Sequence, residues 1–360
     1  MTVTPLYELV SFRLKTGAVL DYLPVSALSY TETLNAAGSM SATVPLDAPG
    51  VTPDSLAPGG TGLMVLRGGV PIWGGILWTL AADLAAGTIT LNASGFHTHY
   101  AGKHFVNGET KDNVDQGAAL REWFARSNAP GSNGIGTDTS QVKNTGRKVS
   151  RSWTRYECMS VAAAIEDLAD DAGGFHFRYV PYWAAEGTKV GNRFLITGVS
   201  ESVSRHTLEH RINCNVTGVS YDSSVLTTNV YTFGADDNSG SKPTVSASNP
   251  DLSALIPAKD VVLTFSDVKD IDTLAKKAAA AISIGRAPIA IPTLTLYPGM
   301  FSPADFMPGD VTTVRVDAGY VRLFNQFVVT ERRVDVASTG VETIGLALAN
   351  RELFENGNTG

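Results

Sequence analysis

The chain has little cysteine and no long apolar run, and both absences narrow what it can be. Only Cys158 and Cys214 occur among its 360 residues, so at most one disulfide can form; we expect two buried free thiols, with a disulfide between them as the alternative. No stretch approaches the roughly 20 apolar residues that a membrane helix needs. Residues 1–8 lack a basic segment followed by an apolar run, which predicts no secretory signal. We therefore expect a soluble protein, made in the cytosol, without membrane binding.

Positive charge is also scarce. The sequence has 28 Lys and Arg against 35 Asp and Glu, a formal net charge of −7. Because phosphate binding needs a positive field, this balance argues against a general affinity for nucleic acid. Hydrophobic residues at 43% and charged residues at 18% indicate a folded globular protein and exclude bulk disorder. At roughly 100–200 residues per domain, the length predicts two to four compact units.

Motifs for catalysis are weak or absent. No Gly-x-Ser-x-Gly elbow is present. The glycines at 131, 134 and 136 lie in a polar loop with no preceding apolar strand and no following Lys-Ser/Thr, which argues against phosphate binding. Four carboxylates lie opposite the apolar stripe of a predicted helix, where a solvated face explains them: Glu166, Asp167, Asp170 and Asp171. Trp73 and Trp78 could line a carbohydrate site, but on a hairpin they are more typical of a core or an interface.

The sharpest chemical candidate is His206-Thr-Leu-Glu-His210, which matches the H-x-x-E-H pattern of some zinc peptidases. Those enzymes need both histidines on one helical face, with the glutamate as base. Here the surrounding residues alternate as in a strand, which separates the two histidines. His206, Glu209 and His210 are therefore only weak metal candidates, and we predict no catalytic, cofactor or metal site and no enzyme activity.

A second group of histidines lies at His97, His99 and His104. On a strand, positions i and i+2 share a face, so the first two could bind a metal ion. No cysteine or carboxylate lies nearby to complete the ligand set. We expect these histidines in the polar connection that leaves the first β unit.

Strand-and-turn sequence fills both ends of the chain. Residues 61–78 predict a hairpin that turns at Gly68-Gly69, and the glycines after Trp73 indicate a bulge or bend. Residues 307–316, 327–336 and 341–349 predict successive amphipathic strands. There is no repeat of fixed period, although two β units of similar size could be structural relatives.

Helical patterns are confined to the interior, at about 115–126, 158–172 and 268–284. The expected fold class is α+β, mainly β, with two small tube-like β-barrels at the chain ends and small α/β modules between them. The predicted organisation is as follows: 1–95 first β-barrel, completed by strands within 195–233; 96–194 α/β module with two helices; 195–233 return strands; 234–258 exposed loop or linker; 259–288 helical segment of a second module; 289–352 second β-barrel; 353–360 tail.

Four segments, in order along almost the whole chain, carry a resemblance to a known family. They are Ala37-Gly-Ser39 before an alternating strand, Arg67-Gly-Gly-Val-Pro-Ile-Trp-Gly-Gly75, Thr228-Asn-Val-Tyr-Thr-Phe-Gly234 before an acidic Gly/Ser-rich loop, and Pro308-Gly-Asp310. With the helical middle, the set resembles the baseplate-hub, or tail-associated (minor tail), proteins of long-tailed bacteriophages, as found among phages of actinobacteria.

The resemblance implies a structural virion protein that forms a homotrimeric ring at the distal end of the tail tube, assembled in the host cytoplasm. Two barrels per chain would present six to a six-fold tube. The partners implied are the tail tube or distal tail protein, the tape-measure protein and tail-tip or fibre proteins, with DNA only in transit and no cofactor.

Two alternatives remain. The first is the distal tail protein, a six-fold ring with little helix, against which the three predicted helices count. The second, from a different class, is a zinc-dependent cell-wall peptidase built on His206 and His210.

Overall fold

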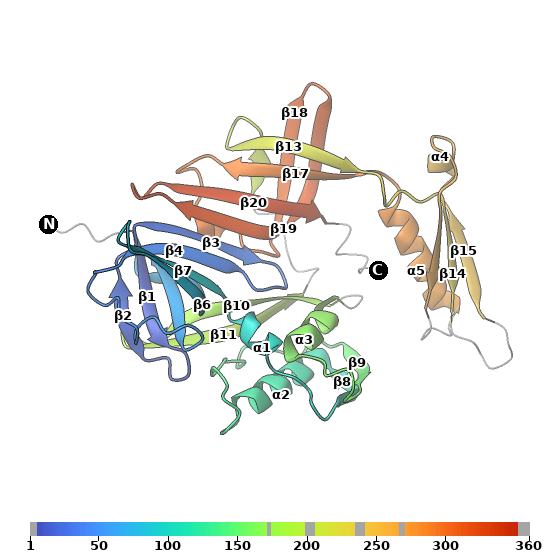
Figure 1. The fold of residues 1–360 in the computed structure, drawn as a ribbon. Helices are drawn as coiled ribbons and strands as arrows, with labels where there is room; N and C mark the ends of the chain where they lie inside the picture. The colour runs from blue at the N-terminus through green and yellow to red at the C-terminus, as the bar shows by residue number, and fades with distance from the viewer. Residues whose placement is uncertain (1–5, 171–173, 199–205, 235–241, 266–270, 352–360) are drawn as a thin grey trace.

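The computed structural model describes residues 6–170, 174–198, 206–234, 242–265 and 271–351. The chain is mainly β (Figure 1), as the sequence predicts. The strands are β1 (Tyr7–Arg13), β2 (Val19–Leu23), β3 (Ala27–Thr33), β4 (Ser39–Pro45), β5 (Thr61–Arg67), β6 (Val70–Asp83), β7 (Thr88–Gly95), β8 (Glu109–Asp115), β9 (Lys148–Trp153), β10 (Phe175–Ala185), β11 (Lys189–Gly198), β12 (Thr207–Glu209), β13 (Cys214–Asp222), β14 (Asn229–Phe233), β15 (Thr244–Ser248), β16 (Asp260–Thr264), β17 (Ile289–Leu296), β18 (Val311–Ala318), β19 (Val321–Val336) and β20 (Glu342–Asn350). The helices are α1 (His97–Ala101), α2 (Gln116–Asn128), α3 (Val161–Asp170), α4 (Pro250–Ser253), α5 (Ile271–Ile284) and the short 3-10 turn η2 (Pro303–Asp305).

Both ends of the chain contribute to a single 13-stranded sheet. Its main order is β13-β17-β20-β19-β3-β4-β7-β6-β5-β1-β2, and β12 and β18 extend it beside β19. The N-terminal and C-terminal parts meet where β3 pairs antiparallel with β19. Two segments about 300 residues apart in sequence thus lie side by side as neighbouring strands (Figure 1).

The same strand order occurs twice in this sheet. We call β3–β7 the N-terminal unit and β13 with β17–β20 the C-terminal unit. Across the sheet the strands of each unit follow the order first, second, fifth, fourth, third, and every pairing is antiparallel. The two β units are therefore related in topology, although the sequence carries no repeat of fixed period.

The third and fourth strands of each unit form a hairpin with a two-residue loop. In the N-terminal unit the loop is Gly68-Gly69, as predicted, and both residues have positive φ (55° and 80°). In the C-terminal unit Ala318 pairs with Val321 around Gly319 (φ 60°). Glycine supplies these positive φ angles without the steric cost that a side chain incurs.

The fourth strand of each unit also carries a bulge toward its end. In β6 the ladder with β7 shifts at Trp78, and in β19 the ladder with β20 shifts at Thr330. A bulge leaves one residue unpaired and bends the strand. Beyond Thr330, β19 leaves β18 and pairs with β3 instead.

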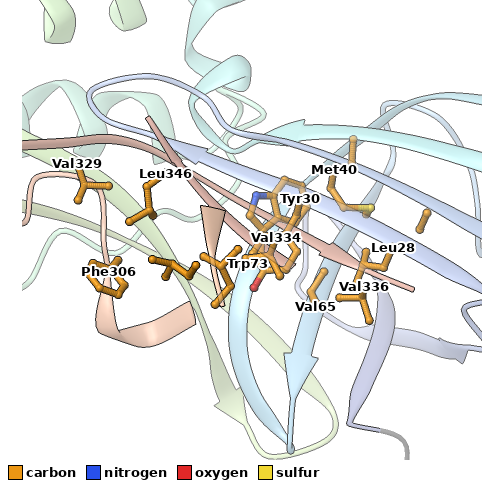
Figure 2. Packing of buried hydrophobic residues seen from close by; sticks show 14 of the residues in the cluster. Leu28, Tyr30, Met40, Val65, Trp73, Phe306, Val329, Val334, Val336 and Leu346 are labelled. Carbon is orange, nitrogen blue, oxygen red and sulfur yellow. The ribbon is translucent and has the colours of Figure 1, made fainter. Parts of the chain in front are cut away.

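One hydrophobic core extends under both units. Tyr30 of β3, Trp73 of β6 and Val334 of β19 lie together at its middle, beside the β3–β19 pairing (Figure 2). The indole Nε1 of Trp73 donates to the carbonyl oxygen of Thr31 at 3.0 Å, so the buried polar atom is satisfied. Trp73 is thus a core residue, as the second of the two interpretations of its sequence position states, and not part of a carbohydrate site.

A second core lies on the other face of the N-terminal strands. Successive residues of β5 alternate between the two: Leu63 and Val65 join the first core, whereas Met64 and Leu66 join the second. This alternation explains why β5 is buried on both faces. The second core is shared with α1–α3 and β8–β11, which lie together on this side of the sheet (Figure 1).

A smaller unit stands apart from the sheet, at the right of Figure 1. It consists of the three-stranded sheet β15-β14-β16 with α5 packed against β14 and β15. The chain enters it after β13 and returns to the main sheet at β17. Since β13 and β17 are neighbours, this unit is inserted between two adjacent strands of the C-terminal unit.

Several boundaries differ from the sequence predictions. The strands of the two chain ends form one continuous 13-stranded sheet, and no closed barrel is found among the described strands. Strands within 195–233 do not complete the first β unit, because β12 pairs with β18 and β13 with β17, both in the C-terminal unit. Strand periodicity predicts a half-buried strand but does not identify its neighbour.

Two further predictions need correction. The predicted linker 234–258 contains β15 and α4, whose residues are ordered by pairing with β14 and by the Asn249 cap on α4; residues 235–241 lie outside the described part of the chain. The first module has three helices, not two, because α1 follows β7 directly. Helices α2, α3 and α5 confirm the three predicted helical segments within a few residues over the described part of the chain, and the predicted positions 171–172 and 268–270 lie outside it.

We expect Val334→Ala to destabilise the protein by about 2–3 kcal/mol, because Val334 is fully buried opposite Tyr30 and the truncation leaves a cavity. The matched control is Val341→Ala, at a position that is 52% exposed, where a change below about 0.5 kcal/mol is expected. Urea unfolding of both variants measures the difference. Equal losses of stability in the two variants would show that the β3–β19 pairing does not contribute to the core as described.

Candidate functional site

The H-x-x-E-H segment lies in an extended conformation, as predicted, with β12 at its centre. A strand rises about 3.3 Å per residue, so four residues place His206 and His210 roughly 13 Å apart. The His206 ring packs against Phe301 and Phe306, with centroids 5.6 and 5.1 Å away. The segment therefore does not bring the two histidines together as metal ligands.

The other polar groups of this segment have structural partners. Nδ1 of His210 accepts from the backbone N–H of Val216 at 3.1 Å. The Glu209 carboxylate lies 3.7 Å from the Arg315 guanidinium on β18. These contacts hold β12 to β18 and to the start of β13. Among the described residues no group of three or more His, Cys, Asp or Glu side chains is placed to hold a metal ion.

The second histidine group lies in the connection that leaves the N-terminal unit, as expected, but on and after α1, and His97 is buried there. Nε2 of His97 lies 2.8 Å from Oε1 of Glu166, and Nδ1 lies 3.1 Å from the Tyr179 hydroxyl. His97 thereby connects α1 to α3 and β10. Burial lowers the pKa of His99 to about 4, with Lys103 adding to the shift. His104 is exposed and bridges to Ser160.

The predicted carboxylate group is divided among separate contacts. Besides Glu166, which meets His97, Asp167 lies 3.4 Å from Arg151. Desolvation, and then the charges of Glu166 and Asp167, raise the pKa of Asp170. Asp171 lies outside the described residues. The face is partly solvated, as predicted for this helix.

The structure also places the remaining residues that the sequence singled out, namely Trp78, three loop glycines and the two cysteines. Trp78 is 43% exposed and its Nε1 donates to Oγ1 of Thr98 at 3.0 Å. The glycines at 131, 134 and 136 follow α2 and precede no helix that could cradle a phosphate. Both cysteines are free thiols. Cys214 is buried, which raises its pKa to about 11, but Cys158 is exposed and precedes α3, contrary to its predicted burial.

Charged groups concentrate instead where the two units meet. Arg332 of β19 is 1% exposed and pairs with Glu32 of β3. Its guanidinium also donates to the carbonyl oxygens of Pro303 and Phe306, the latter at 3.3 Å. Burial lowers the pKa of Arg332 from its ordinary value, yet the carboxylate and carbonyl partners compensate for the lost hydration of the charge.

A second ion pair crosses the same joint. Nε and Nη2 of Arg67, at the end of β5, donate to the two carboxylate oxygens of Glu342 on β20 at 2.7 and 3.2 Å. The hydrogen bonds to Glu342 are the largest cause that raises the pKa of Arg67, and the opposite charge of Glu342 adds to the shift. Sequence reasoning missed both pairs, because charged residues 275 and 300 positions apart give no local signal.

We call the β3–β19 pairing the joint between the two units. Farther from the joint, each unit has a stretch of strand that lacks a neighbouring strand on one side. At one end of the sheet Gly218–Asp222 of β13 pair with β17 alone, and in the N-terminal unit Thr79–Asp83 of β6 pair with β7 alone, among the described strands. The far edge strand β2 is partly covered, since Val19 donates to Thr188 beside β11 at 3.0 Å. Unpaired edges present backbone donors and acceptors to another strand. These two edges are the candidate functional site.

No protein-family model matches the sequence, and no curated protein matches it significantly. Solved structures do share the fold over nearly their whole length. The chain is similar to the tail protein from Neisseria meningitidis MC58, with 13% identity, 97% of this chain and 98% of that chain covered, and a TM-score of 0.61.

Two further solved structures of tail proteins share this fold. The prophage MuSo2 43 kDa tail protein from Shewanella oneidensis has 13% identity, covers 96% of this chain and 99% of its own, and gives a TM-score of 0.57. The prophage tail protein gp18 from Listeria monocytogenes EGD-e has 11% identity, 94% coverage of both chains and a TM-score of 0.55. The chain therefore has the fold of these phage tail proteins.

We expect Glu32→Gln to destabilise the protein by roughly 3 kcal/mol, since it leaves the buried Arg332 charge without its carboxylate. The control is Asp317→Asn, which removes a carboxylate from the exposed pair with Arg322 and should cost less than about 1 kcal/mol. Denaturant unfolding compares the two. A Glu32→Gln variant as stable as the control would contradict the role given to this pair.

We also expect no stoichiometric zinc in the purified protein, because His206 and His210 have structural contacts on an extended segment. Elemental analysis after dialysis against trace zinc, on the parent and on His210→Ala, should give the same background. One zinc per chain, lost in the variant together with a hydrolytic activity, is the result that would restore the peptidase alternative.

Proposed function

We propose that this chain is a structural, non-catalytic protein of a bacteriophage tail, and that three copies form the hub ring at the distal end of the tail tube. The observation that carries the proposal is the doubled strand order within one chain whose fold is that of phage tail proteins. Each β unit would serve as one tube-like element of the ring.

Two units per chain explain how a three-fold ring can meet a six-fold tube. Three chains supply six units of one topology, joined alternately within and between chains. Head-to-tail contacts between copies give a closed ring where the rotation closes, and an open filament where it does not. The β3–β19 pairing supplies the contact within the chain.

Location and partners follow from this role. The ring would lie at the virion tail tip after assembly in the host cytoplasm, between the tail tube or distal tail protein and the tip or fibre proteins. The tape-measure protein and DNA would pass through it. The net charge of −7 suits a wall that releases DNA, because a lysine-lined wall would retain phosphates.

The distal tail protein, a six-fold ring, is the second candidate within the same machinery. The α/β module with α1–α3 and the inserted unit with α5 favour the hub over that mostly helix-free plan. We include an actinobacterial host in the proposal because the sequence resembles hub proteins found among phages of actinobacteria. No helix among the described residues is long and apolar enough to span a bilayer.

Copy number tests the proposal. We expect three chains per tail, with both β units around the channel, in a reconstruction of the tail tip with three-fold and six-fold symmetry compared. Quantitative mass spectrometry against the tube protein gives an independent count. Six chains per tail, or a single β unit facing the channel, would favour the distal-ring alternative.

A further inference from the structure

The joint inside the chain shows how one unit pairs with the next. After the bulge at Thr330, Glu331–Val336 of β19 pair on one side with β20 and on the other with β3. In this joint Arg332, Val334 and Val336 are buried, together with Leu28 and Tyr30 of β3. The fourth strand of the C-terminal unit thus buries its end against the first strand of the N-terminal unit.

The equivalent end of the N-terminal unit has no such neighbour. After the bulge at Trp78, the residues Thr79–Asp83 of β6 pair with β7, and their other edge meets no strand among the described residues. All five are exposed. Strand β6 is therefore bent as β19 is, but its outer edge is free.

The equivalent of β3 is β13, whose residues Gly218–Asp222 meet no strand on their outer edge in the part of the chain that the structure describes. Strand β13 is the first strand of the C-terminal unit and ends the sheet, and its residues Gly218, Ser220, Tyr221 and Asp222 are exposed. A Cβ built on Gly218 meets nothing within 4 Å. Within the described ranges, one chain thus presents one unpaired stretch of each kind that its internal joint uses, Thr79–Asp83 of β6 and Gly218–Asp222 of β13.

Rows of paired residues across the sheet fix which positions correspond. In the N-terminal unit Thr79, Asn92, Ser41 and Ser29 form one row. In the C-terminal unit Glu331, Ala347, Thr293 and Gly218 form the same row. Thr79 therefore corresponds to Glu331, and Gly218 corresponds to Ser29.

From this correspondence we infer that a second copy of this chain pairs its β13 antiparallel with Thr79–Asp83 of β6, in the register of the internal β3–β19 joint. Since Ser29 pairs with Asp335, four residues after Glu331, Gly218 of the second copy pairs four residues after Thr79. The predicted pairs are Thr79 with Asp222, Leu80 with Tyr221, Ala81 with Ser220, Ala82 with Val219, and Asp83 with Gly218.

The side chains suit this register. Leu80 and Tyr221 are 36% and 44% exposed in the single chain, and they occupy the positions of Arg332 and Glu32, which are largely covered in the internal joint. Directly opposite side chains on antiparallel strands contact each other, and a Leu–Tyr pair removes apolar surface from water. Asp83 and Asp222 face Gly218 and Thr79, so no carboxylates oppose one another.

This inference rests on the proposed ring and names the contact that would close it. Each copy offers β6 to one neighbour and β13 to the other, and the contact is head to tail. The occupant is a second copy because the missing neighbour of each edge has its counterpart in the other edge of the same chain.

Disulfide trapping tests the register. In a Cys158→Ser background, which removes the exposed cysteine, Leu80→Cys and Tyr221→Cys are combined in one full-length chain and oxidised with copper phenanthroline. Opposite residues on antiparallel strands have Cα atoms about 4.5–5.5 Å apart, within the range that a disulfide spans. We expect covalent multimers that end at a closed trimer, because trapping accumulates even a weak association.

The control keeps Leu80→Cys and moves the second cysteine by one residue, to Ser220→Cys, whose side chain points to the opposite face. It should give at least tenfold less cross-linked product, with circular dichroism showing that both variants are folded. No cross-link in register, or equal yields from both variants, would overturn the inference.

The outcomes separate this contact from the proposed function. In-register multimers that close at six, or grow without closing, would support the contact and overturn the three-copy hub. Three chains per tail without the in-register cross-link would support the hub and overturn the contact.

Discussion

The pairing of β3 with β19 is the interaction on which the rest of the structure depends. It joins two units of the same strand order into one sheet, so that a single core can lie beneath both. The bulge at Thr330 makes it geometrically available, because β19 must leave β18 before it can accept β3. The buried Glu32–Arg332 pair then fixes which residues face each other, since a slip by one residue would leave the Arg332 charge without its partner.

The same region also positions the α/β module. Asn35 lies two residues after the end of β3 and has a positive φ of 52°. Its side-chain amide accepts from the N–H of Phe177 at 2.8 Å and donates to the carbonyl oxygen of Phe175 at 3.4 Å, both on β10. On the C-terminal side, Gly309 has a φ of 95°, and a Cβ there would lie 3.0 Å from Nδ1 of the buried His176 on β10. One strand of the module therefore contacts both units beside their joint, and the three parts are held at one place.

The sequence predicts local structure well and long-range pairing poorly, for a physical reason. The hairpin turn at Gly68-Gly69, the apolar stripe of α3 and the extended state of 207–209 depend on neighbours within a few residues, and all three are present in the structure. The assignment of β13 to the first unit was wrong because alternating burial identifies a strand but not its partner. Polar composition made 244–253 resemble a linker, whereas pairing with β14 and the Asn249 cap on α4 order it. The joint itself depends on Glu32 and Arg332, which lie 300 residues apart.

The joint within the chain and the proposed joint between copies differ in chemistry. The difference fits the stage at which each joint forms. The internal joint is made once, as the chain folds, and it can bury a charged pair because both partners are always present at high effective concentration. In the proposed joint between copies, each edge must stay soluble until it meets its neighbour. A buried charge would then be costly in the free chain, whereas Leu80 and Tyr221 tolerate exposure singly. Asp83 and Asp222 flank them, and charges beside an exposed edge disfavour unspecific strand pairing. An apolar pair between carboxylates thus gives an edge that resists general aggregation and accepts a partner in one register.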